Sequence, residues 1–300
     1  MGKTLTLSIV MEAASLNYGE GFSNISELKK FNRADGNTYT FASRQSLRYD
    51  MVRLGNEWYG WNLDVISKAK GTLQFNDDAT IEDSVEMDLF GYLKTGKKSL
   101  KRPAVVRLSH GIALEPYTGD MDFLNNMGLA ERIGEMPNLA NIENHVSLYT
   151  YTITVDLDKV GVDINNTIEL SNEQRFERVK QFLDIVKLFS RHIRGRQENL
   201  SPLFVIGGVY KMANPFYQGR IQVKQGNLLV SPLVEVGELT AAGETVKDGT
   251  VVGLVSGTFQ NEAEIREAFV NTASIEQTFN TLIQQVAEHY GVAYEAIATV

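Results

Sequence analysis

The chain has 300 residues, 43% of them hydrophobic, and a formal net charge of −8. This length and apolar content suffice for a full hydrophobic core, in one large domain or in a core domain with insertions. The chain contains no cysteine, which excludes disulfides and thiolate metal sites and fits a reducing cytoplasm. No run of about 18 apolar residues is present, so no membrane span is expected.

The first predicted element is a strand over residues 4–13. Apolar side chains occupy every second position from Leu5 to Ala13 and alternate with Thr4, Thr6, Ser8 and Glu12. This alternation predicts a strand buried on one face and argues against a secretory signal segment. A long polar loop with several glycines follows, up to about residue 42.

A helix is predicted to begin at residue 44, with Ser43 as its N-cap. Arg44 and Arg48 are four residues apart and share a face, with Gln45 beside them. Leu47, Met51 and Leu54 mark the face for packing. A helix start attracts anions, and two guanidiniums beside it suit a phosphate group or a nucleic-acid backbone. The alternative is a solvated arginine face, because paired surface arginines are common.

Four more elements complete an α+β pattern. Strands are expected over 104–114 and 145–157, a helix over 172–193 and an apolar strand over 203–210. The order βαββαβ is that of the ferredoxin-like fold, the scaffold also used by RNA-recognition domains. Two insertions, about 57–102 and 116–144, interrupt this core, and a helical tail is expected over 262–290.

The predicted strand 104–114 places Val106, Leu108, Ile112 and Leu114 on one side. His110 falls on that same side, so a core histidine is its expected role. The four histidines of the chain show no metal-ligand spacing, and neither a metal nor a cofactor is expected. Gly207 and Gly208 within the last strand indicate the close approach of another backbone or a ligand, or a bulge.

Charge is distributed unevenly along the chain. The net negative charge argues against a simple nucleic-acid binder. Basic residues nevertheless gather in two clusters: Lys94, Lys97, Lys98, Lys101, Arg102 and Arg107, and then Lys187, Arg191, Arg194 and Arg196. Acidic residues gather between 77 and 88, where a solvated loop is expected. Such segregation can create a basic groove on an acidic protein, or it can be uneven surface charge without a purpose.

Several residues in loops are candidates for binding or chemistry. Met121, Phe123, Met127 and Met136 in the second insertion could wedge between bases, or could form a small satellite core. Lys211 and Asn214 are candidate contacts to an RNA backbone. Asp35 lies in the loop between the first predicted strand and the first predicted helix, where Asp35-Gly36-Asn37 is typical of an ordinary turn.

Three segments resemble a known family. SIVMEAASLNYGE, TFASRQSLRYDMVR and RPAVVRLSHGIALEPY are similar to the DevR branch of the repeat-associated RNA-binding proteins. These are backbone subunits of type I CRISPR surveillance complexes (Cascade), and the similarity is strongest to the type I-B form. The resemblance implies one RNA-recognition-like domain over 1–300 (the palm), with 57–102 as fingers and 116–144 as a thumb hairpin.

The resemblance also implies a cytoplasmic, non-enzymatic protein with defined partners: the CRISPR RNA, further copies of itself, other Cascade subunits, and target DNA through guide pairing. The residues expected to hold the RNA are Ser43, Arg44, Gln45, Arg48, Lys97, Lys98, Lys101, Arg102, Arg107, Lys211 and Asn214. The thumb would reach over a neighbouring copy and displace a guide nucleotide at regular intervals. Two alternatives stay open: a metal-dependent endoribonuclease that uses Asp35, and an α+β protein with no nucleic-acid role, which the net acidity supports.

Overall fold

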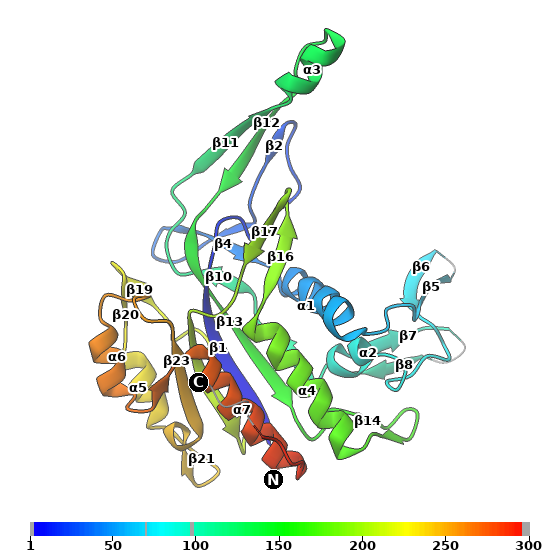
Figure 1. Ribbon diagram of the computed structural model, residues 1–300, viewed down its shortest axis with the longest axis vertical. Coiled ribbons are helices and arrows are strands. Elements are labelled where there is room, and N and C mark those ends of the chain that lie inside the picture. The colour runs from blue at the N-terminus through cyan, green and yellow to red at the C-terminus, as the bar shows by residue number, and fades with distance from the viewer. Residues whose placement is uncertain (1–2, 70, 97–98, 296–300) are drawn as a thin grey trace.

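The computed structural model describes residues 3–69, 71–96 and 99–295. The protein is an α+β structure built on a nine-stranded mixed sheet with the order β24-β23-β18-β1-β13-β10-β4-β3, in which β9 also pairs with β13 (Figure 1). In chain order these strands are β1 (Thr4–Ala13), β3 (Lys30–Asn32), β4 (Thr38–Ala42), β9 (Val106–Leu108), β10 (Gly111–Ala113), β13 (Ser147–Asp156), β18 (Phe204–Tyr210), β23 (Thr250–Leu254) and β24 (Thr272–Ala273). Neighbouring strands are antiparallel except β23 and β24.

Helices cover both faces of the centre of this sheet. On one face lie α1 (Arg44–Tyr59), α4 (Asn172–Lys187) and α7 (Ile275–Tyr290), which pack against the apolar side of β1 and β13 (Figure 1). On the other face, Val10 of β1 and Phe204 of β18 pack against the segment that holds α5 (Ser231–Gly237) and α6 (Glu262–Ala268). As a result β1 is buried at nearly every position, and the prediction that only one of its faces is buried is wrong.

Three serines begin the long helices as N-caps. The hydroxyls of Ser43, Ser171 and Ser274 each accept a backbone N–H one turn into the helix. The cap at Ser274 starts a new helix, so the prediction of one continuous helix over 262–290 is wrong. This segment forms two helices, α6 and α7, with β24 between them. The predicted helix over 172–193 ends at Lys187 for a similar reason, because the chain turns there into the strand that begins at Ser190.

A β-bulge divides the predicted strand 104–114 into β9 and β10. Leu108 pairs with Ile153 and Ile112 pairs with Thr150, so three residues of this strand face two of β13. The extra residue shifts the alternation, and Ala113 instead of Ile112 lies in the core. The prediction that His110 is a core histidine is therefore wrong, since the bulge leaves its side chain exposed.

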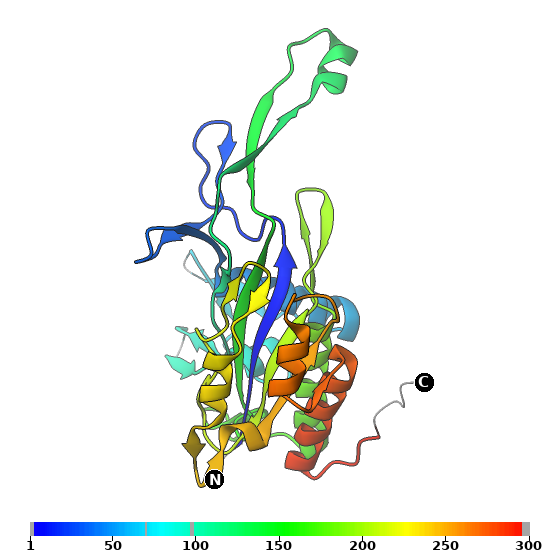
Figure 2. The same cartoon turned by 90° about the vertical axis from the view of Figure 1, so that its left-hand side faces the viewer.

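The chain between α1 and β9 forms a small unit with its own apolar core, at the right of Figure 1. It contains β5 (Ile66–Ala69), β6 (Thr72–Phe75), α2 (Val85–Phe90), β7 (Tyr92–Lys94) and β8 (Leu100–Arg102). A long hairpin, made of β11 (Asp120–Asn125), α3 (Met127–Ile133) and β12 (Leu139–Asn144), rises far beyond the sheet in both views (Figures 1 and 2). We call it the β11–β12 hairpin.

Shorter elements complete the fold. The loop predicted to follow β1 contains β3, β4 and β2 (Ile25–Ser26), and β2 pairs in parallel with β12. A second projecting hairpin consists of β16 (Ser190–Ile193) and β17 (Arg196–Asn199). The others are β14 (Val162–Asp163), β15 (Ile168–Glu169), β19 (Val223–Lys224), β20 (Asn227–Leu228), β21 (Thr240–Ala241), β22 (Glu244–Thr245) and the 3-10 helix η1 (Val246–Gly249).

The paired glycines of β18 lie where backbones approach closely, as predicted. A Cβ atom on Gly207 would lie 2.0 Å from the carbonyl oxygen of Thr6, and one on Gly208 would lie 1.8 Å from that of Gly249. Gly207 also has a φ of +153°, which side-chain-bearing residues avoid. The predicted close approach is thus made by neighbouring backbone on both sides of β18.

Candidate nucleic-acid interface

The start of α1 is held in place by two neighbouring segments. The Asn17 Oδ1 accepts the backbone N–H of Ser43 at 3.2 Å, and the Ser43 Oγ accepts the N–H of Ser46 at 3.2 Å. The backbone N–H of Arg44 donates to Nδ1 of His110 at 3.1 Å. One orphan donor of the first turn is thus satisfied by a side chain from the β-bulge. Because Nδ1 accepts this bond, the neutral ring carries its proton on Nε2.

The two arginines of the first turns lie on one face of α1 but are not equivalent. Leu47, Met51 and Leu54 are buried beneath the helix, as predicted, so Arg44 and Arg48 face away from the core. Arg48 donates to Glu86 at 2.6 Å and lies over the ring of Phe90, 4.9 Å from its centroid. Arg44 is exposed, and no ion pair with another described residue holds it. Of these two arginines, Arg44 is therefore the more available to an anionic ligand.

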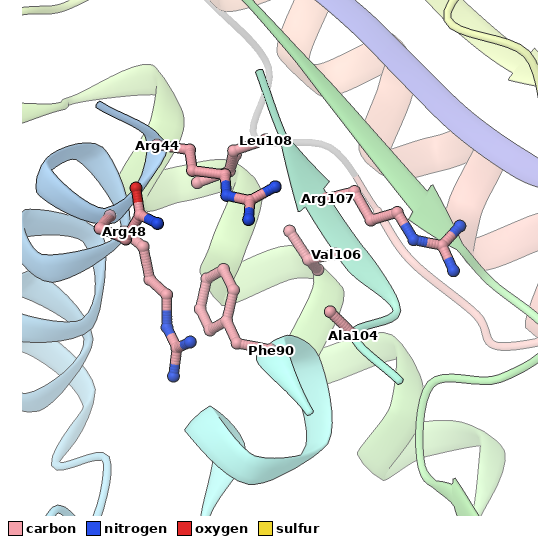
Figure 3. Close-up of a pocket in the computed structure, with 8 residues that line it drawn as sticks. Arg44, Arg48, Phe90, Ala104, Val106, Arg107 and Leu108 are labelled. Atoms are coloured by element: carbon pink, nitrogen blue, oxygen red, sulfur yellow. The ribbon is translucent and has the colours of Figure 1, made fainter. Parts of the chain in front are cut away.

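A hollow of about 370 Å³ opens beside these arginines (Figure 3). Arg44, Gln45 and Arg48 line it from α1, Phe90 from α2, and the remainder comes from residues 104–108. In Figure 3 the guanidiniums of Arg44 and Arg48 flank this hollow, whereas the side chain of Arg107 points away from both. The side chain of Arg107 is exposed.

Two further hollows adjoin the first and extend it in both directions. One, of about 570 Å³, shares Arg48, Phe90 and Ala104 with it and is also lined by Lys101. The other, of about 500 Å³, shares Arg44 and Leu108 and extends past the bulge. This third hollow is lined also by Arg33, Ser109, His110, Gln218 and Gln222. We call the three together the arginine groove. Its length and its cations suit a chain of phosphates better than one compact ligand.

Sequence reasoning missed Arg33, Phe90 and His110 as lining residues of this groove. Arg33 belongs to the β3–β4 hairpin, which the sequence analysis treated as loop, and its guanidinium lies 5.2 Å from the centroid of the Tyr39 ring. Asp35-Gly36 between alternating aromatic residues is a hairpin signal that could have revealed it. The place of His110 depends on the bulge, for which the sequence offers no comparable signal.

Other predicted basic residues do not reach the groove. Arg102 is buried, and its guanidinium donates to Asp88 at 2.7 Å and to the carbonyl oxygen of Lys159 at 3.0 Å, so its assignment to an RNA contact is corrected. Lys211 pairs with Glu244, and the β21–β22 hairpin lies at the lower end of the molecule in Figure 1, away from α1. Asn214 is exposed in the turn that follows Lys211. Lys97 and Lys98 lie outside the described residues.

The acidic segment is partly internal instead of solvated. Asp88 is fully buried and binds both Arg102 and Arg178, each at 2.7 Å. Glu86, which lies on the same helix α2 as Asp88, pairs with Arg48 of α1. Lys94 of the first basic cluster is buried as well, with its Nζ donating to the carbonyl oxygen of Ala79. Asp88, Glu86, Lys94 and Arg102 thus already have partners within the protein, whereas Asp78, Glu82 and Asp83 are exposed.

The β11–β12 hairpin exposes its apolar side chains. Met121 is 53% exposed, Phe123 57%, Met127 51% and Met136 88%. Each of the four is at least half exposed, so the alternative that they form a satellite core under the loop is wrong. A protruding hairpin with exposed methionines and an aromatic ring is a surface for contact with bases or with another protein chain.

Asp35 occupies a turn and has partners on both carboxylate oxygens. Oδ1 accepts the N–H of Asn37 at 3.0 Å, and Oδ2 accepts the hydroxyl of Tyr39 at 2.7 Å. These bonds, led by that of Asn37, lower the pKa of the Asp35 carboxyl below its ordinary value. Among the described residues, no group of three or more acidic or histidine side chains could hold a metal ion. No helix in the described part of the chain is long and apolar enough to cross a membrane.

The sequence from residue 5 to residue 224 matches the family described as "CRISPR-associated negative auto-regulator DevR/Csa2". The chain belongs to this family. Membership confirms the predicted class of function, because the DevR/Csa2 family supplies non-catalytic backbone subunits of Cascade. No curated protein sequence matches the chain significantly.

Solved structures share the fold of this DevR/Csa2 member. A chain described as "CRISPR RNA-guided surveillance complex" is 16% identical with a TM-score of 0.56, and the match covers 95% of this chain and 99% of that chain. A second, described as "CRISPR RNA-guided surveillance complex, pre-nicking", is 13% identical with a TM-score of 0.59, and covers 94% and 99%. At these identities the likeness concerns the fold.

Proposed function

We propose that the protein is a type I-B Cascade backbone subunit that grips the CRISPR RNA by its phosphates in the arginine groove. The observation that carries this proposal is the exposed guanidinium of Arg44, which has no ion pair with another described residue and lies beside the first turn of α1, at the junction of two of the adjoining hollows. Ser43, Gln45, Arg48, Lys101 and Arg107 are the further contacts. Backbone contacts leave the base edges free, so sequence is read by pairing between guide and target DNA.

The palm of this subunit is a ferredoxin-like, RNA-recognition-like core. Its elements in chain order are β1, α1, β9 with β10, β13, α4 and β18. The four strands lie in the order β18-β1-β13-β10, each antiparallel to its neighbours, and both helices pack on one face. That order and that placement of helices are those of the split βαβ arrangement.

The two insertions take the roles of fingers and thumb around this palm. The unit within 57–102 lines one end of the arginine groove and forms the fingers. The β11–β12 hairpin within 116–144 forms the thumb, and its exposed side chains reach over the next copy and displace a guide nucleotide. A thumb on one copy that meets the palm of the next is a heterologous interface, which leads to an open filament. Guide length and the other Cascade subunits at its ends limit that filament in the cytoplasm.

Metal-dependent RNA cleavage by Asp35 is the weaker alternative. Its carboxylate is occupied within the turn, and no candidate ligand cluster surrounds it in the described residues. Incubation of the purified complex with labelled complementary RNA and magnesium separates the two functions. We expect intact RNA, whereas regularly spaced cuts that Asp35→Asn abolishes would establish the endoribonuclease.

The main test is the RNA that co-purifies with the chain from its native host. We expect CRISPR RNA of defined length in complexes with other Cascade subunits, and its loss when Arg44 and Arg48 are both replaced with alanine. A control variant, Glu57→Gln, alters α1 at its other end, where Glu57 pairs with Arg53. Purification of the chain free of RNA, or with RNA that the double variant retains, would exclude the arginine groove as the binding site.

A further inference from the structure

The β16–β17 hairpin carries the second basic cluster, and its inner and outer cations differ. Arg191 at its base is buried, with Nη1 donating to the carbonyl oxygen of Leu16 and Nε at 3.7 Å from Oδ2 of Asp50. Arg194 and Arg196 at its tip are exposed, and neither lies within 4 Å of a carboxylate of the described residues. The inner cation anchors the hairpin, and the outer two are free to bind.

The base of the hairpin is firmly attached to α1 and to the end of β1. Arg53 donates to the carbonyl oxygen of Ser190 at 2.9 Å, and Glu198 accepts the backbone N–H of Ala14 at 2.7 Å. The backbone N–H of Leu200 closes the base by donating to the carbonyl oxygen of Phe189 at 2.8 Å. Such bonds on both strands fix the direction in which the tip projects.

The tip is a two-residue turn in an unfavourable backbone conformation. Ile193 pairs with Arg196, and the turn residues Arg194 and Gly195 have φ of +46° and +78°. Asn or Gly suits the first of these positions better than Arg does. The Arg194 guanidinium lies 4.3 Å from the centroid of the Tyr18 ring, and the Tyr18 hydroxyl donates to the carbonyl oxygen of Glu143 at 3.0 Å. An arginine kept in a disfavoured turn and held over an aromatic ring is pre-organised for a ligand.

The hairpin and the arginine groove lie on opposite flanks of α1. Arg53, which binds the hairpin, follows Arg44 by nine residues. Nine residues of an α-helix make about two and a half turns, so the two side chains point to opposite sides of the helix. Roughly 10 Å of helix therefore separates the two surfaces. The tip projects past the end of the sheet, on the same side as the β11–β12 hairpin (Figure 2). A nucleic-acid strand that lies in the arginine groove of one copy therefore does not continue directly onto the tip of the β16–β17 hairpin of that same copy.

We propose that Arg194 and Arg196 form a second phosphate-binding site, which takes the phosphodiester backbone of a strand other than the segment in the same copy's arginine groove. Two strands offer this chemistry: the guide segment held by a neighbouring copy, and the strand paired to the guide. The proposal rests on the proposed function, since it assumes that the groove holds the guide. Guanidiniums suit phosphate because they donate in a planar fork.

The test uses an Arg194→Gly/Arg196→Ala variant of the full chain. Glycine fits a φ of +46° without strain, so the variant is expected to keep its melting temperature. The matched control is Lys159→Ala/Lys247→Ala, which removes the same charge from two exposed side chains that line neither the arginine groove nor the β16–β17 hairpin. Fluorescence anisotropy at several salt concentrations follows two labelled probes: a guide RNA long enough for several copies, and a complementary strand added to the preassembled guide complex.

We expect the variant, and not the control, to weaken binding about tenfold in one arm and to flatten the salt dependence there by about 1.4 slope units, or about 0.7 for each contact to a single strand. Weaker binding of the guide RNA would identify the guide segment held by a neighbouring copy as the strand that Arg194 and Arg196 bind. Weaker binding of the complementary strand would identify the strand paired to the guide. Unchanged affinity and slope in both arms, or an equal loss in the control, would overturn the second site. Loss of guide binding on Arg44→Ala/Arg48→Ala tests the groove separately.

Discussion

Replacing Arg44 with alanine should weaken RNA binding more than replacing Arg48, although the two lie on one face of one helix. Arg44 has no ion pair with another described residue, whereas Arg48 must loosen its 2.6 Å contact with Glu86 to bind a phosphate. A hydrogen bond to a charged group contributes about 1.5–3 kcal/mol net. We therefore expect a loss of about 2 kcal/mol, or about 30-fold in Kd, for Arg44→Ala. For Arg48→Ala we expect about 1 kcal/mol, or about fivefold, because breaking the existing pair offsets part of the gain.

Glu86→Gln separates this explanation from a simple difference in position. The amide keeps an oxygen that can accept from Arg48 but removes the competing charge, so RNA binding should tighten a few-fold and Arg48→Ala should then cost more. Glu57→Gln is the matched control, because Glu57 also pairs with an arginine of α1, at 2.8 Å, but on the flank away from the groove. Net charge changes equally in both variants, so only a local effect distinguishes them.

The assay is fluorescence anisotropy with two guide RNAs of unrelated sequence, repeated over a range of salt concentrations. Each arginine lost from a phosphate contact should lower the salt slope by about 0.7. Both RNAs should respond alike, since phosphates carry no sequence. The reasoning fails if Arg44→Ala leaves Kd and slope unchanged, or if Glu86→Gln weakens binding as its control does not.

Three further predictions concern assembly, stability and pH. Phe123→Ser/Met136→Ser should change the free energy of unfolding by less than about 0.5 kcal/mol, because both side chains are mostly exposed. Light scattering should nevertheless show shorter RNA-dependent assemblies for this variant. Assemblies of full length would contradict the thumb assignment. Asp88→Ala leaves the buried Arg102 and the half-buried Arg178 without this carboxylate and should cost about 3–5 kcal/mol in urea unfolding, so a loss below about 1 kcal/mol would contradict the buried network. Burial lowers the pKa of His145 in the folded protein, so the unfolded chain takes up the proton more readily and the melting temperature should fall as pH drops below about 6.5. His145→Gln should reduce this fall, and an unchanged fall would contradict the role of His145. The reduction is only partial, because burial also lowers the pKa of His289.

The elements predicted correctly are those whose pattern is local. Strand β1 and helix α1 each show their period within one segment, and strand β18 is one continuous apolar run. Ser43 caps its helix through a residue three positions away. The errors occur where distant pairing decides. The bulge between β9 and β10 follows from the register with β13, and the break before α7 accompanies the pairing of β24 with β23. Neither partner could be identified from the segment alone.

The site was predicted in part for the same reason. Arg44 and Arg48 were placed together correctly, because their relation is a matter of helix period. Arg102 was misplaced, because its availability depends on Asp88, which approaches it from another element. A run of basic residues shows where cations lie in the chain, and only the folded structure shows which of them already have a carboxylate partner.

This distinction also bears on the net charge of −8, which appeared to argue against nucleic-acid binding. An internal ion pair removes one charge of each sign, so it leaves the net charge unchanged while it removes a cation from the surface that a ligand meets. Arg102 and Arg191 are lost in this way, whereas Arg44, Arg194 and Arg196 have no carboxylate partner in the described part of the chain. A polyanion responds to the local field of such unpaired cations within about 8–10 Å at physiological salt, and carboxylates farther away are screened from it. The sign of the whole chain therefore does not decide the question, and the location of its unpaired guanidiniums does.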